Sequence, residues 1–226
     1  MKQNFKISLQ QYGMAVLLGT ISIGISNGTM AKSPAQANKV LRYAFPVAET
    51  GFDPAAVQDL YSAHVLYSIF DTLYTYDYLA SPAKLVPNAA AALPEVSADG
   101  LTYTIRLKKG IYFSPDPVFK GKPRELTAAD YAYSFKRLLD PQLHSPSSWL
   151  FEGRIAGMDS AIQQANKTGK FNYEQSIAGL QTPDRYTLVI RLTEPNHNFP
   201  MLLALQPTGA VAREVIEHYR DKAGFV

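Results

Sequence analysis

Two stretches of the chain alternate apolar and polar residues, which is the pattern of a half-buried β-strand. Residues 101–108 read LTYTIRLK, and residues 186–192 read YTLVIRL. Every second side chain in each stretch is apolar, so one face can pack on a core while the other meets solvent. A turn signal precedes each stretch, and no fixed period relates their flanks. We therefore expect residues 102–108 and 186–192 to be two antiparallel strands of one sheet, separated by helices, and not a repeat.

Three other stretches place apolar residues at helical spacing. Residues 60–74 carry an apolar stripe and predict an amphipathic helix. A second helix is expected from residue 128, with Thr127 as its N-cap, Asp130 completing a capping box and Asp140 before a proline at its end. Residues 158–167 predict a third helix.

The segment before the first of these helices has a different character. Residues 40–45 (VLRYAF) read as a short strand that Pro46 stops. Residues 49–54 (ETGFDP) then form a turn-rich link whose Asp-Pro suits the start of a turn or helix.

The N-terminus carries the features of an export signal. Lys2 and Lys6 precede an apolar core at residues 14–25, which is too short to span a bilayer comfortably. Ala35-Gln36-Ala37 then offers small residues to a signal peptidase, so cleavage would leave Asn38 first. An uncleaved membrane anchor is the alternative interpretation. The sequence predicts a soluble periplasmic protein with no lipid anchor, because the chain contains no cysteine.

The charge changes once this leader is set aside. The whole chain has 22 Lys and Arg against 19 Asp and Glu, and three of the lysines lie in the first 37 residues, which contain no acid. The remainder therefore has a net charge of zero. A neutral chain without a basic run gives no support for nucleic-acid binding.

Taken in order, the motifs resemble a known family over the chain from Val40 to its end. They are LRYAF and FDP, LTYTIRLKKGIYF, LTAADYAYSFKRLLDP, IAGMDSA, and PDRYTLVIRLTEPNHNFPMLL. This series closely resembles the N-terminal part of the periplasmic oligopeptide- and dipeptide-binding proteins of ABC importers, the family 5 solute-binding proteins. The resemblance implies an α/β (α+β mixed) fold of the periplasmic binding protein-like type II, with a small mixed-sheet domain inserted in the first lobe. It also implies that the chain ends before the second lobe.

The same resemblance implies a division of the chain into four parts. Residues 1–37 would be the signal peptide, and residues 38–70 would begin lobe I. Residues 71–210 would form the inserted small α/β domain, which contains both alternating strands. Residues 211–226 would return to lobe I.

The ligand-binding candidates also come from the resemblance. In relatives, the segment matching Gln58, Asp59, Leu60 and Tyr61 offers its backbone to a peptide as an added strand edge. Relatives place a ligand-touching aromatic directly after a Ser-Pro. Here Ser147 stands in that position, and Trp149 could occupy the space. The alternatives are a simple helix entry at residues 58–61 and a core anchor at Trp149.

No motif in the chain indicates catalysis, a cofactor or a metal site. The sequence has no G-x-S-x-G, phosphate-binding loop or G-x-G-x-x-G, and its four histidines occur singly. The charged run at residues 120–125 reads as a solvated loop. The resemblance implies a non-enzymatic receptor that captures a peptide or another small solute, works with an inner-membrane ABC permease and is a monomer when full length. The competing hypotheses are an exported hydrolase with catalytic residues beyond this chain, and a stand-alone interaction module.

Overall fold

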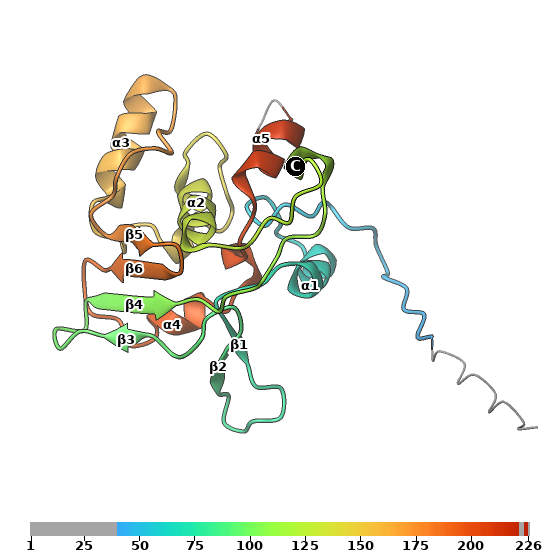
Figure 1. Ribbon diagram of the computed structural model, residues 1–226. Helices are drawn as coiled ribbons and strands as arrows, with labels where there is room; N and C mark the ends of the chain where they lie inside the picture. Colours follow the sequence, from blue (N-terminus) through green and yellow to red (C-terminus); the bar gives the residue numbers. More distant parts are fainter. Residues whose placement is uncertain (1–39, 222–223, 226) are drawn as a thin grey trace, which may run out of the picture. The chain divides into compact units, whose positions relative to one another are not determined.

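The computed structural model describes residues 40–221 and 224–225 (Figure 1). The predicted signal peptide at residues 1–37 lies outside the described residues. Residues 44–226 group into one compact unit, and the fold given below is that of this unit. The predicted strand at residues 40–45 is wrong, because these residues have no regular secondary structure and Leu41 is 91% exposed. No described strand pairs with this segment.

A four-stranded antiparallel sheet forms the centre of the unit. Its strands are β3 (Glu95–Val96), β4 (Thr102–Arg106), β5 (Leu180–Asp184) and β6 (Thr187–Arg191), in the order β3-β4-β6-β5. Strands β4 and β6 pair directly, with Ile105 opposite Leu188, which confirms the prediction of one antiparallel sheet. The pairings are all antiparallel among the described residues, whereas a mixed sheet was expected.

Residues 182–184 (TPD) lie in strand β5, although the sequence predicts a turn there before the second alternating stretch. The sheet order places β5 at the edge, next to β6 alone. An edge strand tolerates proline since one side of its backbone needs no partner. A register shift between Gln181 and Asp184 accompanies the proline.

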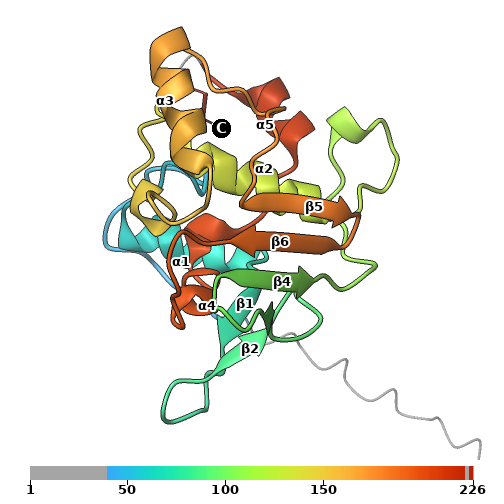
Figure 2. The same cartoon turned by 90° about the vertical axis from the view of Figure 1, so that its left-hand side faces the viewer.

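Helix α2 (Ala128–Leu139) packs against β5 and β6 on one side of the sheet (Figure 2). The predicted stripe is confirmed, since Ala128, Tyr131, Phe135 and Leu138 are all buried. The backbone N–H and the hydroxyl of Thr127 both donate to Asp130 Oδ2, at 2.7 and 2.8 Å. This contact confirms the predicted start of the helix.

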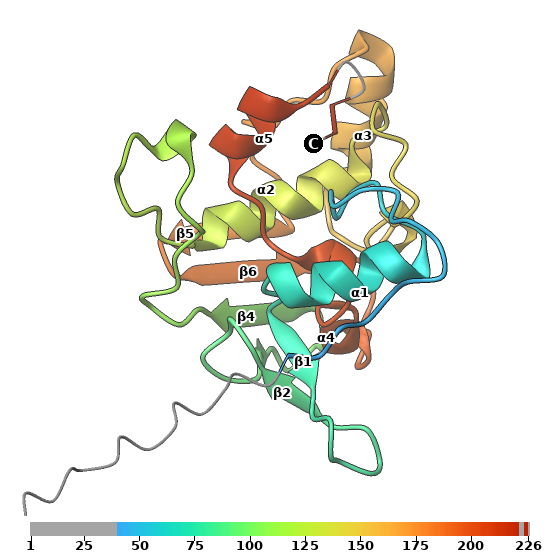
Figure 3. The same cartoon turned by 90° about the vertical axis from the view of Figure 1, so that its right-hand side faces the viewer.

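Helix α1 (Leu60–Ile69) lies on the same side of the sheet as α2 (Figure 3). It is shorter than the predicted 60–74, because Phe70 is already extended and Tyr74 begins a strand. The pairing of β1 (Tyr74–Tyr76) with β2 (Leu85–Pro87) decides the boundary. A backbone partner brought from later in the chain overrides the local helical pattern.

The remaining elements surround this framework. Helix α3 (Met158–Thr168) confirms the third predicted helix, and α4 (Phe199–Leu202) and α5 (Arg213–Tyr219) follow β6. Short 3₁₀ turns are η1 (Pro117–Phe119), η2 (Ser148–Leu150) and η3 (Gln206–Thr208). Aromatic rings from separate elements meet in the core, where the centroids of Phe135 and Phe151 are 4.6 Å apart.

Candidate functional site

A segment without regular secondary structure, whose backbone groups are mostly open, precedes α1. The backbone N–H of Thr50 donates a hydrogen bond to Ser62 Oγ at 2.9 Å. The other backbone N–H groups of residues 47–52 have no hydrogen-bond acceptor among the described residues. The carbonyl groups of residues 47–52 accept no hydrogen bond from described residues. Val47 and Phe52 are 58% and 42% exposed. The segment is therefore an unpaired backbone edge that another chain can reach.

The sequence prediction placed the ligand-binding backbone at residues 58–61, after this segment. Leu60 and Tyr61 lie in the first turn of α1, so their backbone is helical and cannot form a strand edge. Gln58 is exposed and remains outside the helix. Leu60 is 61% exposed, while the Tyr61 ring packs on Phe45 with centroids 5.3 Å apart. The available signal was a proline-bounded stretch without apolar periodicity at residues 47–52.

Asp59 fixes the open segment to the start of α1. Its Oδ1 accepts the Ser62 backbone N–H at 2.8 Å, as an N-cap does, and its Oδ2 accepts the Thr50 hydroxyl at 2.5 Å. Hydrogen bonds from the Ser62 side chain and backbone, followed by that from Thr50, hold the pKa of Asp59 well below its usual range. Asp59 therefore positions the segment as an ionised carboxylate.

A buried ion pair sets the turn that follows the open segment. Arg137 on α2 donates to both carboxylate oxygens of Asp53, at 2.8 and 2.7 Å, and both side chains are 2% exposed. Asp53 also accepts the Ala55 backbone N–H at 2.9 Å. Burial alone would lower the pKa of Arg137, but the contact with Asp53 raises it overall. The Phe-Asp-Pro turn is thereby attached to the second helix of the unit.

The second candidate segment reaches the same turn. The Ser145 hydroxyl donates to the Ala55 carbonyl at 2.6 Å, which joins two loops 90 residues apart. Ser147 is buried at 7% exposure, and its backbone N–H donates to Ser145 Oγ at 3.3 Å. Trp149 is 54% exposed, so its side chain is open to a ligand and is not a core anchor. Leu150 is the buried apolar residue of this turn.

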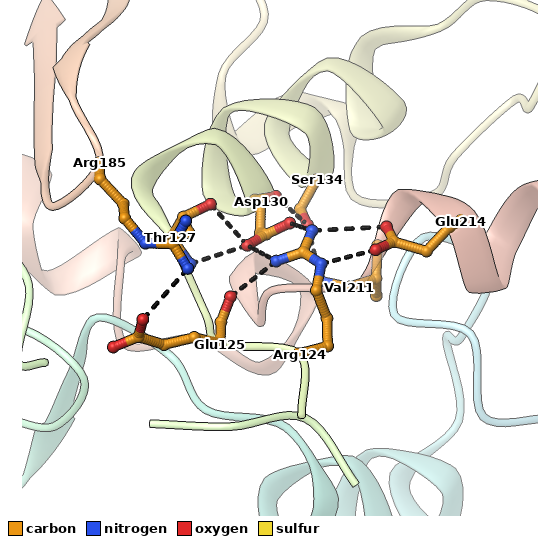
Figure 4. Close-up of polar contacts among 8 residues, drawn as sticks. All are labelled: Arg124, Glu125, Thr127, Asp130, Ser134, Arg185, Val211 and Glu214. Atoms are coloured by element: carbon orange, nitrogen blue, oxygen red, sulfur yellow. Dashed lines mark hydrogen bonds and ion pairs between the residues drawn. The ribbon is translucent and has the colours of Figure 1, made fainter. Parts of the chain in front are cut away.

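A polar cluster at the other end of α2 joins that helix to α5 (Figure 4). The Arg124 guanidinium contacts Asp130 Oδ1 at 2.6 Å and Glu214 Oε1 at 2.6 Å, and it donates to the Glu125 carbonyl at 2.7 Å. Burial alone would lower the pKa of Arg124, but the hydrogen bonds that it donates to Asp130 and Glu214 raise it. The interpretation of residues 120–125 as a solvated loop is wrong for Arg124, whose side chain is 25% exposed. Its N–H groups are hydrogen-bonded to Asp130, Glu214 and the Glu125 carbonyl.

The described residues contain no group of three or more His, Cys, Asp or Glu that is arranged to hold a metal ion. Among the same residues, no helix is both long enough and apolar enough to cross a membrane. The candidate site consists of the open backbone at residues 47–52, the exposed Gln58 before α1 and the exposed Trp149 on the loop that Ser145 joins to Ala55. Such an arrangement suits binding through backbone hydrogen bonds and aromatic contact.

Comparison with known proteins assigns the family. Residues 84–224 match the model described as "Bacterial extracellular solute-binding proteins, family 5 Middle". The "Di/tripeptide-binding protein 2" of Pseudomonas aeruginosa is 38% identical over 46% of this chain and 19% of its own length. The "Glutathione-binding protein GsiB" of Escherichia coli (strain K12) is 28% identical over 92% of this chain and 34% of its own length.

Solved structures agree with this assignment. Haemophilus influenzae OppA in complex with the peptide RPPGFSPFR matches with a TM-score of 0.61 and 27% identity, over 76% of this chain and 30% of that one. The pheromone receptor PrgZ matches with a TM-score of 0.60 and 28% identity over the same shares. The chain thus spans between a fifth and about a third of the length of the relatives it matches. The fold is that of the periplasmic binding protein-like OppA proteins, and the chain belongs to the bacterial extracellular solute-binding proteins, family 5.

Proposed function

We propose that the chain is an extracytoplasmic binding component of an ABC importer, which captures peptides or a similar small solute between two lobes and delivers them to a membrane permease. The family supports this proposal, as do relatives named for binding di- and tripeptides, oligopeptides and glutathione. The observation that carries it is the open backbone edge at residues 47–52. Peptides of varied sequence share a backbone, so an unpaired edge recognises them without selecting their side chains.

The six residues predicted from the sequence take different parts in this proposal. A peptide lies along residues 47–52, and Gln58 and Trp149 contact it with exposed side chains. Asp59 and Ser147 act indirectly, because each is engaged in holding its loop. Leu60 and Tyr61 border the site at the first turn of α1.

A proline substitution tests the backbone edge. Ala48→Pro removes one N–H that has no partner among the described residues, and it favours the extended backbone before it. In isothermal titration calorimetry of the protein extended to both lobes, we expect roughly five- to tenfold weaker binding of a di- to pentapeptide pool, since one backbone hydrogen bond is lost. Ala48→Ser keeps the N–H and is the matched control. Equal affinity of the two variants would exclude recognition through this edge.

Two further measurements address the competing hypotheses. N-terminal sequencing of protein recovered from the periplasm should show Asn38 first, whereas an intact Met1 on a membrane-bound species would support an anchor. Mass spectrometry of peptides incubated with the protein should show no cleavage. Cleavage would move the function to the hydrolase class.

The predicted domain boundaries at residues 70 and 210 stay a prediction.

A further inference from the structure

The loop that follows α2, at residues 140–151, carries Trp149 on a backbone that is fixed at both ends. Asp140 is buried and ends α2. At the other end the Phe151 side chain is completely buried, and its ring centroid is 4.6 Å from that of Phe135. Trp149, two residues before this anchor, is 54% exposed. The tryptophan therefore projects from a loop whose two ends belong to the core.

The middle of this loop is held by one buried hydroxyl. Ser145 donates to the Ala55 carbonyl at 2.6 Å and accepts the Ser147 N–H at 3.3 Å. His144, directly before it, has a φ of 48°, which is uncommon for a residue other than glycine. Such a conformation persists where the surroundings hold it, and here the residues on both sides, Leu143 and Ser145, are buried. The loop is therefore held in its middle as well as at its ends.

The turn that Ser145 contacts is itself fixed by a buried ion pair. Asp53 accepts the Ala55 N–H at 2.9 Å and two N–H groups of Arg137 at 2.8 and 2.7 Å. Both side chains of the pair are 2% exposed, so water does not compete for these contacts. The N–H of Ala55 is thus bound to Asp53 and its carbonyl to Ser145. A continuous series of buried hydrogen bonds runs from α2 through this turn to the loop that carries Trp149.

We propose that Asp53 and Ser145 are positioning residues for Trp149, which hold its loop in one conformation before a ligand arrives. Both side chains are buried, so each acts on the loop through the backbone of Ala55 and not by touching a ligand. A side chain that is already in place loses little conformational freedom on binding, which strengthens its contact with a ligand. The contact of Trp149 with a ligand rests on the proposed function, whereas its positioning by Asp53 and Ser145 does not.

Three variants separate positioning from a general loss of stability. Ser145→Ala removes the donor to the Ala55 carbonyl. Asp53→Leu with Arg137→Met removes the acceptor of the Ala55 N–H without leaving a buried charge. Ser134→Ala is the matched control, because it removes another buried hydroxyl, which donates to a backbone carbonyl at 2.8 Å within α2 and lies outside the series. Circular dichroism spectra equal to that of the unsubstituted chain will verify that each variant is folded.

Trp149 is the only tryptophan of the chain, so its fluorescence reports on this loop directly. Time-resolved anisotropy separates the fast local motion of the side chain from tumbling of the whole molecule. We expect the amplitude of the local motion to rise roughly twofold in Ser145→Ala and in the double variant, and to stay unchanged in Ser134→Ala. An unchanged amplitude in Ser145→Ala or in the double variant would overturn the role of Ser145 or of Asp53, respectively. An equal rise in Ser134→Ala would overturn both, because the motion would then follow stability and not the series of contacts.

Peptide titration of the protein extended to both lobes separates this proposal from the proposed function. We expect Ser145→Ala to bind a di- to pentapeptide pool roughly three- to fivefold more weakly than Ser134→Ala, because its loop is in the binding conformation for only a fraction of the time. No binding by the unsubstituted protein would contradict the proposed function and leave the fluorescence result unaffected. Equal affinity of the two variants, with Trp149 more mobile in Ser145→Ala, would overturn the claim that this positioning serves binding.

Discussion

The sheet with α2 and the open segment before α1 are held in place by different forces. In the first region, residues from β4, β6 and α2, among them Ile105, Phe135 and Leu188, are completely buried. In the second region, residues 47–52 have no regular secondary structure. Its polar contacts are those of Thr50 with Ser62 and Asp59, and the Asp53–Arg137 ion pair holds the turn that follows.

The difference shows how a stable core and an accessible backbone segment coexist in one unit. Burial of apolar area is not directional, so the sheet region tolerates changes that preserve volume. A polar contact fixes one atom against another, so it can hold a backbone segment in place while its N–H groups stay unpaired. The open segment needs such contacts because pairing it in a sheet would remove the groups that a ligand would use.

Loss of Arg137 should have the largest effect. Arg137→Met leaves the buried Asp53 carboxylate without the neutralising guanidinium, so we expect the free energy of unfolding to fall by about 3–5 kcal/mol. Urea denaturation followed by circular dichroism measures the change. The double variant Asp53→Leu with Arg137→Met should recover most of the loss, because no buried charge remains. A loss equal to or greater than that of the single variant would show that the pair itself, and not the orphaned charge, stabilises the fold.

A core substitution with a similar cost in stability should change hydrogen exchange in a different region. Ile190→Ala in β6 removes a completely buried side chain, and we expect it to cost about 2–5 kcal/mol. Hydrogen exchange under native conditions should leave residues 46–59 as in the unsubstituted chain, whereas Arg137→Met should accelerate exchange there. Identical exchange patterns in the two variants would contradict the separation of the two regions.

Ser145→Ala should have a smaller, local effect. It removes the donor to the Ala55 carbonyl, and we expect a loss of about 1 kcal/mol. Chemical denaturation measures the loss, and peptide titration should show weaker binding, because the loop that carries Trp149 is no longer tied to the turn. Ser148→Ala is the matched control, since no described residue hydrogen-bonds its hydroxyl. Equal stability and equal peptide affinity of the two variants would show that the Ser145–Ala55 hydrogen bond does not connect the two loops.

The smallest effect concerns the pH dependence of Asp59. Its pKa is lowered in the folded state by hydrogen bonds from Ser62 and Thr50, so its contribution to stability is complete above the unfolded pKa of about 3.9. That contribution is lost as the pH falls below this value towards the folded pKa. The side-chain carboxyl ¹³C shift should therefore show Asp59 ionised at about pH 3. Asp59→Asn should remove the corresponding pH dependence of amide protection in the first turn of α1.

Much of the framework could be read from periodicity. The alternation at residues 102–108 and 186–192, the stripe in α2 and the capping role of Thr127 are local patterns, and the structure reproduces each of them. The family could be recognised in the same way, because the order of the motifs is a property of the sequence. Trp149 and Gln58 were found by resemblance, and their exposure in the structure is compatible with contact to a ligand.

Tertiary structure alone decided the features that depend on distant partners. The end of α1 at Ile69 follows from the pairing of Tyr74 with Pro87, and the β5 strand depends on its place at the sheet edge. The turn that follows residues 47–52 is held at Asp53 and Ala55 by Arg137 and Ser145, which lie more than 80 residues further along the chain. Periodicity reports which face of an element is buried, but it contains no information about which remote side chain will satisfy a backbone group. The sequence therefore determined the elements and the family, and the packing of remote residues determined where the backbone stays open.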